Sequence, residues 1–147
     1  MVHRPHSSHL RTGRHSQAGG IYLVTAVTAD RRPVFDDFHA ARQLIQILHH
    51  HEFASRANTL AYVVMPDHLH WLLQLGEAES LSACVQRIKS MATKAIGPDL
   101  WQKGFHDHAI RCEEDLPAIA RYIVANPVRA GLVSRVGVYP HWDAIWV

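Results

Sequence analysis

Cysteine is scarce in this chain, and its two copies, Cys84 and Cys112, stand far apart. Without a Cys-x-x-Cys pair, the sequence lacks the ligand spacing of a zinc knuckle, and it has too few cysteines for a disulfide framework. We therefore expect both thiols to be reduced and partly buried.

Long hydrophobic runs are also missing. No apolar segment approaches the ~18 residues of a membrane span, and the N-terminus has no apolar region of the kind found in signal peptides. We therefore expect a cytoplasmic protein with no membrane partner. A chain of 147 residues accommodates one domain with its own core, and we assign residues 1–147 to it.

Acidic residues are absent from the start of the chain, where the first is Asp30. Residues 1–20 contain three arginines and four histidines instead. A basic arm over residues 1–19 suits a polyanionic partner, whereas a solvated tail with no partner is the alternative. The net charge of the whole chain is only +2, so the charge distribution says more than the total.

Strand and helix patterns alternate regularly along the rest of the chain. β-branched and apolar residues predict strands at 21–28, 59–65, 68–75 and 104–111. Apolar residues at helical spacing predict helices at about 38–54, 81–96 and 116–125. The order β-α-β-β-α-β, followed by a further helix that carries Tyr122, predicts an α+β fold with a ferredoxin-like antiparallel sheet.

Histidine is unusually frequent, with 13 residues, and three His-x-His pairs occur. Chance alone gives about one such pair at this frequency, so their context matters. His68 and His70 stand on a predicted strand, where residues i and i+2 project from the same face and could hold a divalent ion together. Two half-buried histidines bonded to the backbone would show the same spacing.

Tyr122 and Asn126 form a second candidate pair, one turn apart on a predicted helix. A phenol is a possible nucleophile toward a phosphodiester, and an amide oxygen is a hard ligand suited to Mg²⁺ or Mn²⁺. A tyrosine that packs against the sheet and an asparagine that caps the helix would explain the same spacing.

Two long segments resemble the REP-associated tyrosine transposases, a branch of the single-tyrosine HUH transposases. Residues 63–73 (Val-Val-Met-Pro-Asp-His-Leu-His-Trp-Leu-Leu) are similar to the HUH segment. Residues 121–133 (Arg-Tyr-Ile-Val-Ala-Asn-Pro-Val-Arg-Ala-Gly-Leu-Val) are similar to the tyrosine helix. Shorter matches at 20–25, 32–35 and 101–105 extend the resemblance over nearly the whole chain.

The resemblance implies a metal-dependent enzyme that nicks and rejoins single-stranded or hairpin DNA from repetitive extragenic palindromes. It makes Tyr122 the nucleophile and His68, His70 and Asn126 the ligands of Mg²⁺ or Mn²⁺. Attack by Tyr122 would give a 5′-phosphotyrosine and a free 3′-hydroxyl, and a later 3′-hydroxyl would rejoin the DNA. The same resemblance favours a monomer over a homodimer, associated with the nucleoid when bound to DNA.

Basic residues outside this centre are candidates for DNA contacts. They are Arg11, Arg14, Lys89, Lys94, Arg111 and Arg129. Arg11 and Arg14 would read a short guide sequence beside the hairpin, and for the two lysines a solvated helix face is the alternative.

Two other functions and the identity of the general base stay open. One function is a zinc-type hydrolase that uses His68 and His70 with His106 or His108. The other is a DNA-hairpin binding module that does not cleave. Either His106 or His108 could also assist deprotonation of the tyrosine.

Overall fold

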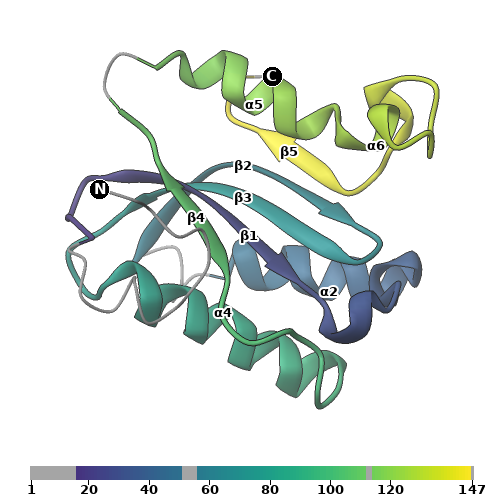
Figure 1. The fold of residues 1–147 in the computed structure, drawn as a ribbon, viewed down its shortest axis with the longest axis horizontal. Coiled ribbons are helices and arrows are strands. Elements are labelled where there is room, and N and C mark those ends of the chain that lie inside the picture. Colours follow the sequence, from purple (N-terminus) through teal and green to yellow (C-terminus); the bar gives the residue numbers. More distant parts are fainter. Residues whose placement is uncertain (1–15, 51–55, 112–113, 147) are drawn as a thin grey trace.

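A computed structural model describes residues 16–50, 56–111 and 114–146, which form a five-stranded sheet with helices on both faces (Figure 1). The strands are β1 (Ile21–Val27), β2 (Ala57–Met65), β3 (His68–Leu75), β4 (His106–Ala109) and β5 (Trp142–Ala144). The helices are α2 (Phe38–Leu48), α4 (Leu81–Ile96), α5 (Leu116–Val124) and α6 (Asn126–Arg129), with 3-10 turns at Ala29–Arg31, Val34–Asp36 and Val136–Val138.

The strand order is β4-β1-β3-β2-β5, and neighbouring strands pair antiparallel throughout. The first four strands in this order, with α2 and α4 as the crossovers, confirm the expected ferredoxin-like α+β fold. Helix α5, which contains Tyr122, is the further helix that the sequence predicts.

Each longer helix begins where a short polar side chain takes over amides of the first turn that have no helical partner. Asp37, Ser80 and Asp115 each accept a hydrogen bond from an amide two or three residues further along the chain. Helix α4 stops at Gly97, whose φ of 155° favours glycine. These residues fix where the helices start and stop against the sheet.

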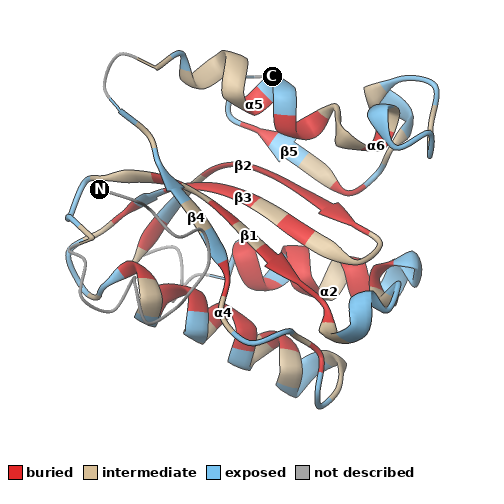
Figure 2. Cartoon of the chain, viewed as in Figure 1, coloured by how far each residue is buried: buried red, intermediate tan, exposed pale blue. Residues whose placement is uncertain are grey.

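The sheet buries side chains on both faces (Figure 2). The face covered by α2 and α4 holds the larger core, which includes Leu44, Trp71 and Ile88. The face covered by α5 holds a smaller core, which includes Leu72 and Ile123. Because alternate strand residues point to opposite faces, the odd-numbered positions of β3 supply the larger core, and the even-numbered ones face α5.

Three elements differ from the sequence prediction. Helix α2 ends at Leu48, with His49 as its C-cap, and does not continue to the expected end near residue 54. Strand β4 covers only His106–Ala109 rather than 104–111, and Phe105, directly before it, packs in the larger core. The C-terminal segment packs back on the domain as expected, but it also forms β5, which pairs with β2. A three-residue strand is too short to produce a recognisable pattern.

Cys84 is buried without a disulfide, as expected, and Cys112 falls outside the described residues. In the part of the chain that the structure describes, no helix has the length and apolar character needed to cross a membrane.

Candidate active site

His68 and His70 lie side by side on the face of the sheet that α5 covers. Their ring centroids are 4.7 Å apart with the rings nearly perpendicular. In the sheet, His70 stands opposite Thr25 of β1, and His68 stands opposite Val27. The predicted projection of both imidazoles from one face is therefore what the structure forms, while their role as metal ligands stays a prediction.

The Nδ1 atom of each imidazole is held by a neighbouring side chain. Nδ1 of His68 lies 2.7 Å from Oδ1 of Asp67, and Nδ1 of His70 lies 2.9 Å from Oγ1 of Thr25. Asp67 is itself fixed, because Nη1 of Arg31 donates to its Oδ2 at 2.8 Å. With both Nδ1 atoms engaged, Nε2 is the atom of each ring that is suited to bind a metal ion.

The ionisation of these groups supports such a role. Burial, with the charges of His68 and Arg129 as smaller causes, lowers the pKa of His70 to about 4. His70 therefore keeps its lone pair at neutral pH. Burial on its own would raise the pKa of Asp67, but hydrogen bonds from His68 and Arg31 outweigh it and lower that pKa. Asp67 is thus an ionised acceptor for His68.

Tyr122 presents its phenol to solvent from α5. It is 65% exposed, and the guanidinium carbon of Arg129 lies 3.8 Å from its ring centroid. Such a cation over the ring face is an attractive contact. The charge of Arg129 is also a minor cause of the lowered pKa of His70.

The other three tyrosines are packing or hydrogen-bonding residues. Tyr22 and Tyr62 are buried, and Oη of Tyr139 donates to the carbonyl of Val64 at 2.6 Å. Burial raises the pKa of Tyr62 and of Tyr139 to about 12. Tyr122 is therefore the tyrosine best placed to reach a substrate.

Helix α5 ends at Val124, close to the end that the Asn-Pro pair predicts, and Asn126 opens α6 after a break at Ala125. The cause is Pro127, which has no N–H to donate to the carbonyl of Ile123. Nδ2 of Asn126 takes over that role at 2.8 Å. This bond engages the donor end of the amide, so its oxygen is the end that a cation would take.

The three-histidine centre of a zinc-type hydrolase is not assembled. Over the described ranges, no group of three or more His, Cys, Asp or Glu side chains is arranged to hold a metal ion. His106 is exposed on β4 opposite Thr25, and Nε2 of His108 lies 3.6 Å from Oε2 of Glu114. The role of Asn126 as a third ligand stays a prediction.

The prediction that Lys89 is an exposed residue of α4 that contacts DNA is wrong. Its side chain is buried, and Nζ donates to the carbonyls of Gln102 and Gly104 at 2.8 and 2.7 Å. Nζ also lies 6.0 Å from the centroid of the Trp101 ring. Because these internal partners hold the ammonium, Lys89 is no candidate for a phosphate contact.

The other basic candidates are spread over the molecule. Arg129 lies at Tyr122, whereas Lys94 is exposed on α4, on the opposite side of the sheet from the histidine pair. Arg111 is exposed just after β4. Arg11 and Arg14 fall outside the described residues. Among the basic candidates that the structure describes, only Arg129 therefore lies at the candidate site.

Sequence reasoning missed the residues that hold the histidines. Asp67 had a local signal, since it directly precedes His68 in the Pro-Asp-His turn. Thr25 had none, because its contact with His70 depends on the register of β1 against β3.

Comparison with known proteins identifies the family of this chain. Residues 17–126 match the family of IS200-like transposases. The chain therefore belongs to this family and is an enzyme of the transposase type. Its relatives include the REP-associated tyrosine transposase of Escherichia coli, 39% identical over 83 residues that cover 54% of this chain and 50% of the relative.

A Haemophilus influenzae protein provisionally named a REP-associated tyrosine transposase is 29% identical over 144 residues, which cover 84% of this chain and 78% of that protein. Among solved structures, a REP-associated tyrosine transposase bound to a REP hairpin superposes with a TM-score of 0.71 at 28% identity, over 88% of this chain and 79% of the other. A transposase-like protein of Deinococcus radiodurans shares the fold at 21% identity, with a TM-score of 0.52 over 76% and 93% of the two chains.

Proposed function

We propose that this transposase nicks and rejoins single-stranded DNA at hairpin or palindromic repeats, in a metal-dependent reaction that passes through a 5′-phosphotyrosine. The observation that carries the proposal is the presence of two chemistries on one side of the sheet. The paired imidazoles of His68 and His70 lie on the face that α5 covers, and α5 exposes Tyr122, whose ring Arg129 contacts.

The residues present fit a hard divalent cation such as Mg²⁺ or Mn²⁺. His68 and His70 offer Nε2 atoms whose rings are oriented through Nδ1, and the oxygen of Asn126 is of the ligand type that these ions accept. When bound, the cation would polarise a non-bridging oxygen of the scissile phosphate.

Tyr122 supplies the nucleophile. Its Oη attacks phosphorus, the Oη–P bond forms and the P–O3′ bond breaks. The downstream strand is then attached to the protein through its 5′-phosphate. The phenolic proton passes to solvent, and the departing O3′ takes up a proton. The guanidinium of Arg129 over the ring holds the phenol in place and offers a positive charge to the DNA backbone. Because the phosphotyrosine keeps the energy of a phosphodiester, a later 3′-hydroxyl reverses the steps without ATP.

Hairpin DNA is the substrate class that the comparisons favour, since the related enzyme at 28% identity is described with a REP hairpin bound. The solvent-exposed guanidinium of Arg129 suits a polyanion. We further propose that the protein works in the cytoplasm, at the nucleoid when bound to DNA, and as a monomer.

A labelled single-stranded oligonucleotide with a palindromic hairpin tests the proposal on a denaturing gel. We expect cleavage with Mn²⁺ or Mg²⁺, none with EDTA, and a band of protein attached to DNA that disappears after protease treatment. Hairpin binding without any cleavage would support the binding-module alternative. Cleavage that releases a 5′-phosphate without a protein adduct would support a hydrolase.

A further inference from the structure

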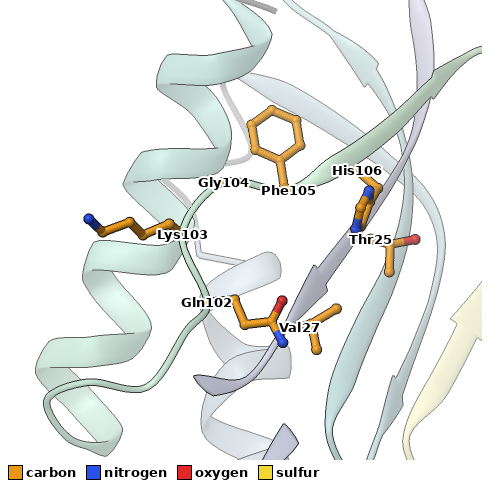
Figure 3. Close-up of a pocket in the computed structure, with 7 residues that line it drawn as sticks. All are labelled: Thr25, Val27, Gln102, Lys103, Gly104, Phe105 and His106. Atoms are coloured by element: carbon orange, nitrogen blue, oxygen red, sulfur yellow. The ribbon is translucent and has the colours of Figure 1, made fainter. Parts of the chain in front are cut away.

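A pocket of about 200 Å³ opens beside the histidine pair, between β1 and the segment that leads into β4 (Figure 3). Thr25 and Val27 of β1 form its floor, and Gln102, Gly104 and His106 form its wall. The volume equals about six or seven water molecules at ~30 Å³ each, which suits one planar ring system and is too small for a base pair.

The floor of this pocket adjoins the candidate active site directly. Thr25 and Val27 are the strand partners of His70 and His68. Residues directly opposite in an antiparallel pair point to the same face, and adjacent strands are about 4.8 Å apart. A nucleotide whose phosphate lies at the histidines therefore has this pocket within reach of its own base or of the neighbouring one.

The wall is held rigidly from behind by Lys89. The buried ammonium donates to the carbonyls of both Gln102 and Gly104, and the indole of Trp101 donates to the carbonyl of Lys89 at 3.2 Å. Phe105 anchors the same segment in the larger core. A lysine that is 7% exposed is rarely found in a core without a role, and here its role is to fix the shape of the wall.

The groups that face the pocket suit a base edge rather than a phosphate. Gln102 directs its amide toward Val27, and His106 directs its imidazole toward Thr25 (Figure 3). An amide and an imidazole both donate and accept hydrogen bonds, as a base edge requires. Lys103, also in the lining, directs its ammonium away from the pocket (Figure 3).

We propose that this pocket holds the base of a nucleotide next to the scissile phosphate. Gln102 and His106 then determine which base must stand beside the bond that is cleaved. This inference rests on the proposed single-strand cleavage. Lys89 acts through the wall and is a positioning residue for the selection.

Binding of free deoxynucleosides tests the pocket without any cleavage. We would titrate the full chain with each of the four deoxynucleosides and, separately, with inorganic phosphate, and follow amide signals by NMR. We expect at least one deoxynucleoside to shift the signals of the Gln102 side chain and Gly104, and Gln102→Ala to weaken that binding about tenfold at Gly104. The matched control is Gln86→Ala, since Gln86 is likewise exposed but lies on α4. Shifts at Gly104 with phosphate alone, or none with any deoxynucleoside, would overturn the proposal.

Cleavage of a hairpin library tests the selection itself. The hairpin carries randomised single-stranded flanks, and sequencing of the cleaved products gives the base preference at each position. We expect Gln102→Ala, His106→Ala and Lys89→Met to reduce the preference about tenfold at one position beside the cut and nowhere else. His39→Ala, an exposed histidine on α2, is the control.

The two experiments separate the two proposals. A wild-type protein that binds deoxynucleosides at Gly104 but cleaves no library member would leave the pocket standing and refute the proposed function. Cleavage with an unchanged base preference in both Gln102→Ala and His106→Ala would refute the pocket and leave the function standing. Circular dichroism of each variant establishes that it is folded.

Discussion

Oγ1 of Thr25 lies 2.9 Å from Nδ1 of His70, across the β1–β3 ladder in which the two residues are direct partners. The hydroxyl holds the imidazole in one orientation, and Asp67 does the same for His68 at 2.7 Å. Outer groups of this kind fix the tautomer of a ligating histidine and aim its other nitrogen at the metal. Thr25 also forms part of the pocket floor, so the same residue borders both sites.

Thr25→Val and Asp67→Asn should therefore weaken Mn²⁺ binding about 10- to 100-fold, the usual effect of removing an outer partner of a metal ligand. Electron paramagnetic resonance of free Mn²⁺ during a protein titration measures this directly. Thr25→Ser keeps the hydroxyl and should keep the affinity, and Thr93→Val on α4 is the control for the loss of a threonine. Equal affinities for Thr25→Val and wild type would show that the hydroxyl does not orient the ring.

Most of the fold follows from the sequence because each element carries a local signal. The helices begin at Asp37, Ser80 and Asp115, whose side chains cap amides close by in the chain. Strand β5 carried no such signal, since its three residues are defined by pairing with β2 and by the anchoring of Tyr139 on Val64. Pairing between distant segments is a property of the whole chain and not of a short window.

The parts of the site that a short motif defines could be predicted from the sequence. The parts that depend on how distant segments pair could not. The pair His68 and His70 follows from alternation along one strand. Lys89 has the sequence pattern of a solvated residue beside Lys94, yet only Lys89 meets two carbonyls of the 102–104 segment. Local spacing gives a helix face, and the segment that packs against that face decides which residues are buried.

His141 provides a pH-dependent contribution to stability. It is buried between Phe38 and Tyr139, with ring centroids at 5.1 and 5.6 Å. Burial, and secondarily the charge of Arg42, lowers the pKa of His141 below its usual value of 6.5. As the pH falls below that value, the unfolded chain binds a proton that the folded chain does not, so the free energy of unfolding decreases.

His141→Phe should remove this contribution. Between pH 7.5 and pH 5.5, the free energy of unfolding of this variant should therefore decrease less than that of wild type. Urea unfolding followed by tryptophan fluorescence at the two pH values measures the difference. Parallel losses in the two proteins would mean that other groups dominate the acid sensitivity.

The basic N-terminal arm should contribute to DNA affinity through its charge. Residues 1–15 contain Arg4, Arg11 and Arg14, and removing them leaves intact the bond from the amide of Leu81 to Oγ of Ser16. For each phosphate that the protein no longer neutralises, the slope of log affinity against log salt falls by about 0.7 for single strands and about 0.9 for duplex. We therefore expect weaker hairpin binding and a slope smaller by about 2 to 3, measured by fluorescence anisotropy. An unchanged slope would place the arm outside the interface.

Tyr122 should be the site of the covalent bond to DNA. It is the tyrosine that is 65% exposed, whereas Tyr22 and Tyr62 are buried and Tyr139 is bonded to the backbone. Tyr122→Phe removes one oxygen and keeps the ring beneath Arg129, so hairpin affinity and thermal stability should match wild type. Cleavage and adduct formation should both stop, because attack on phosphorus needs the phenolic oxygen. Tyr139→Phe is the matched control, and it should still cleave and give the adduct band on a denaturing gel. Peptide mapping of an adduct trapped with wild type should place the DNA on Tyr122. An adduct on any other residue, or full cleavage by Tyr122→Phe, would overturn the mechanism.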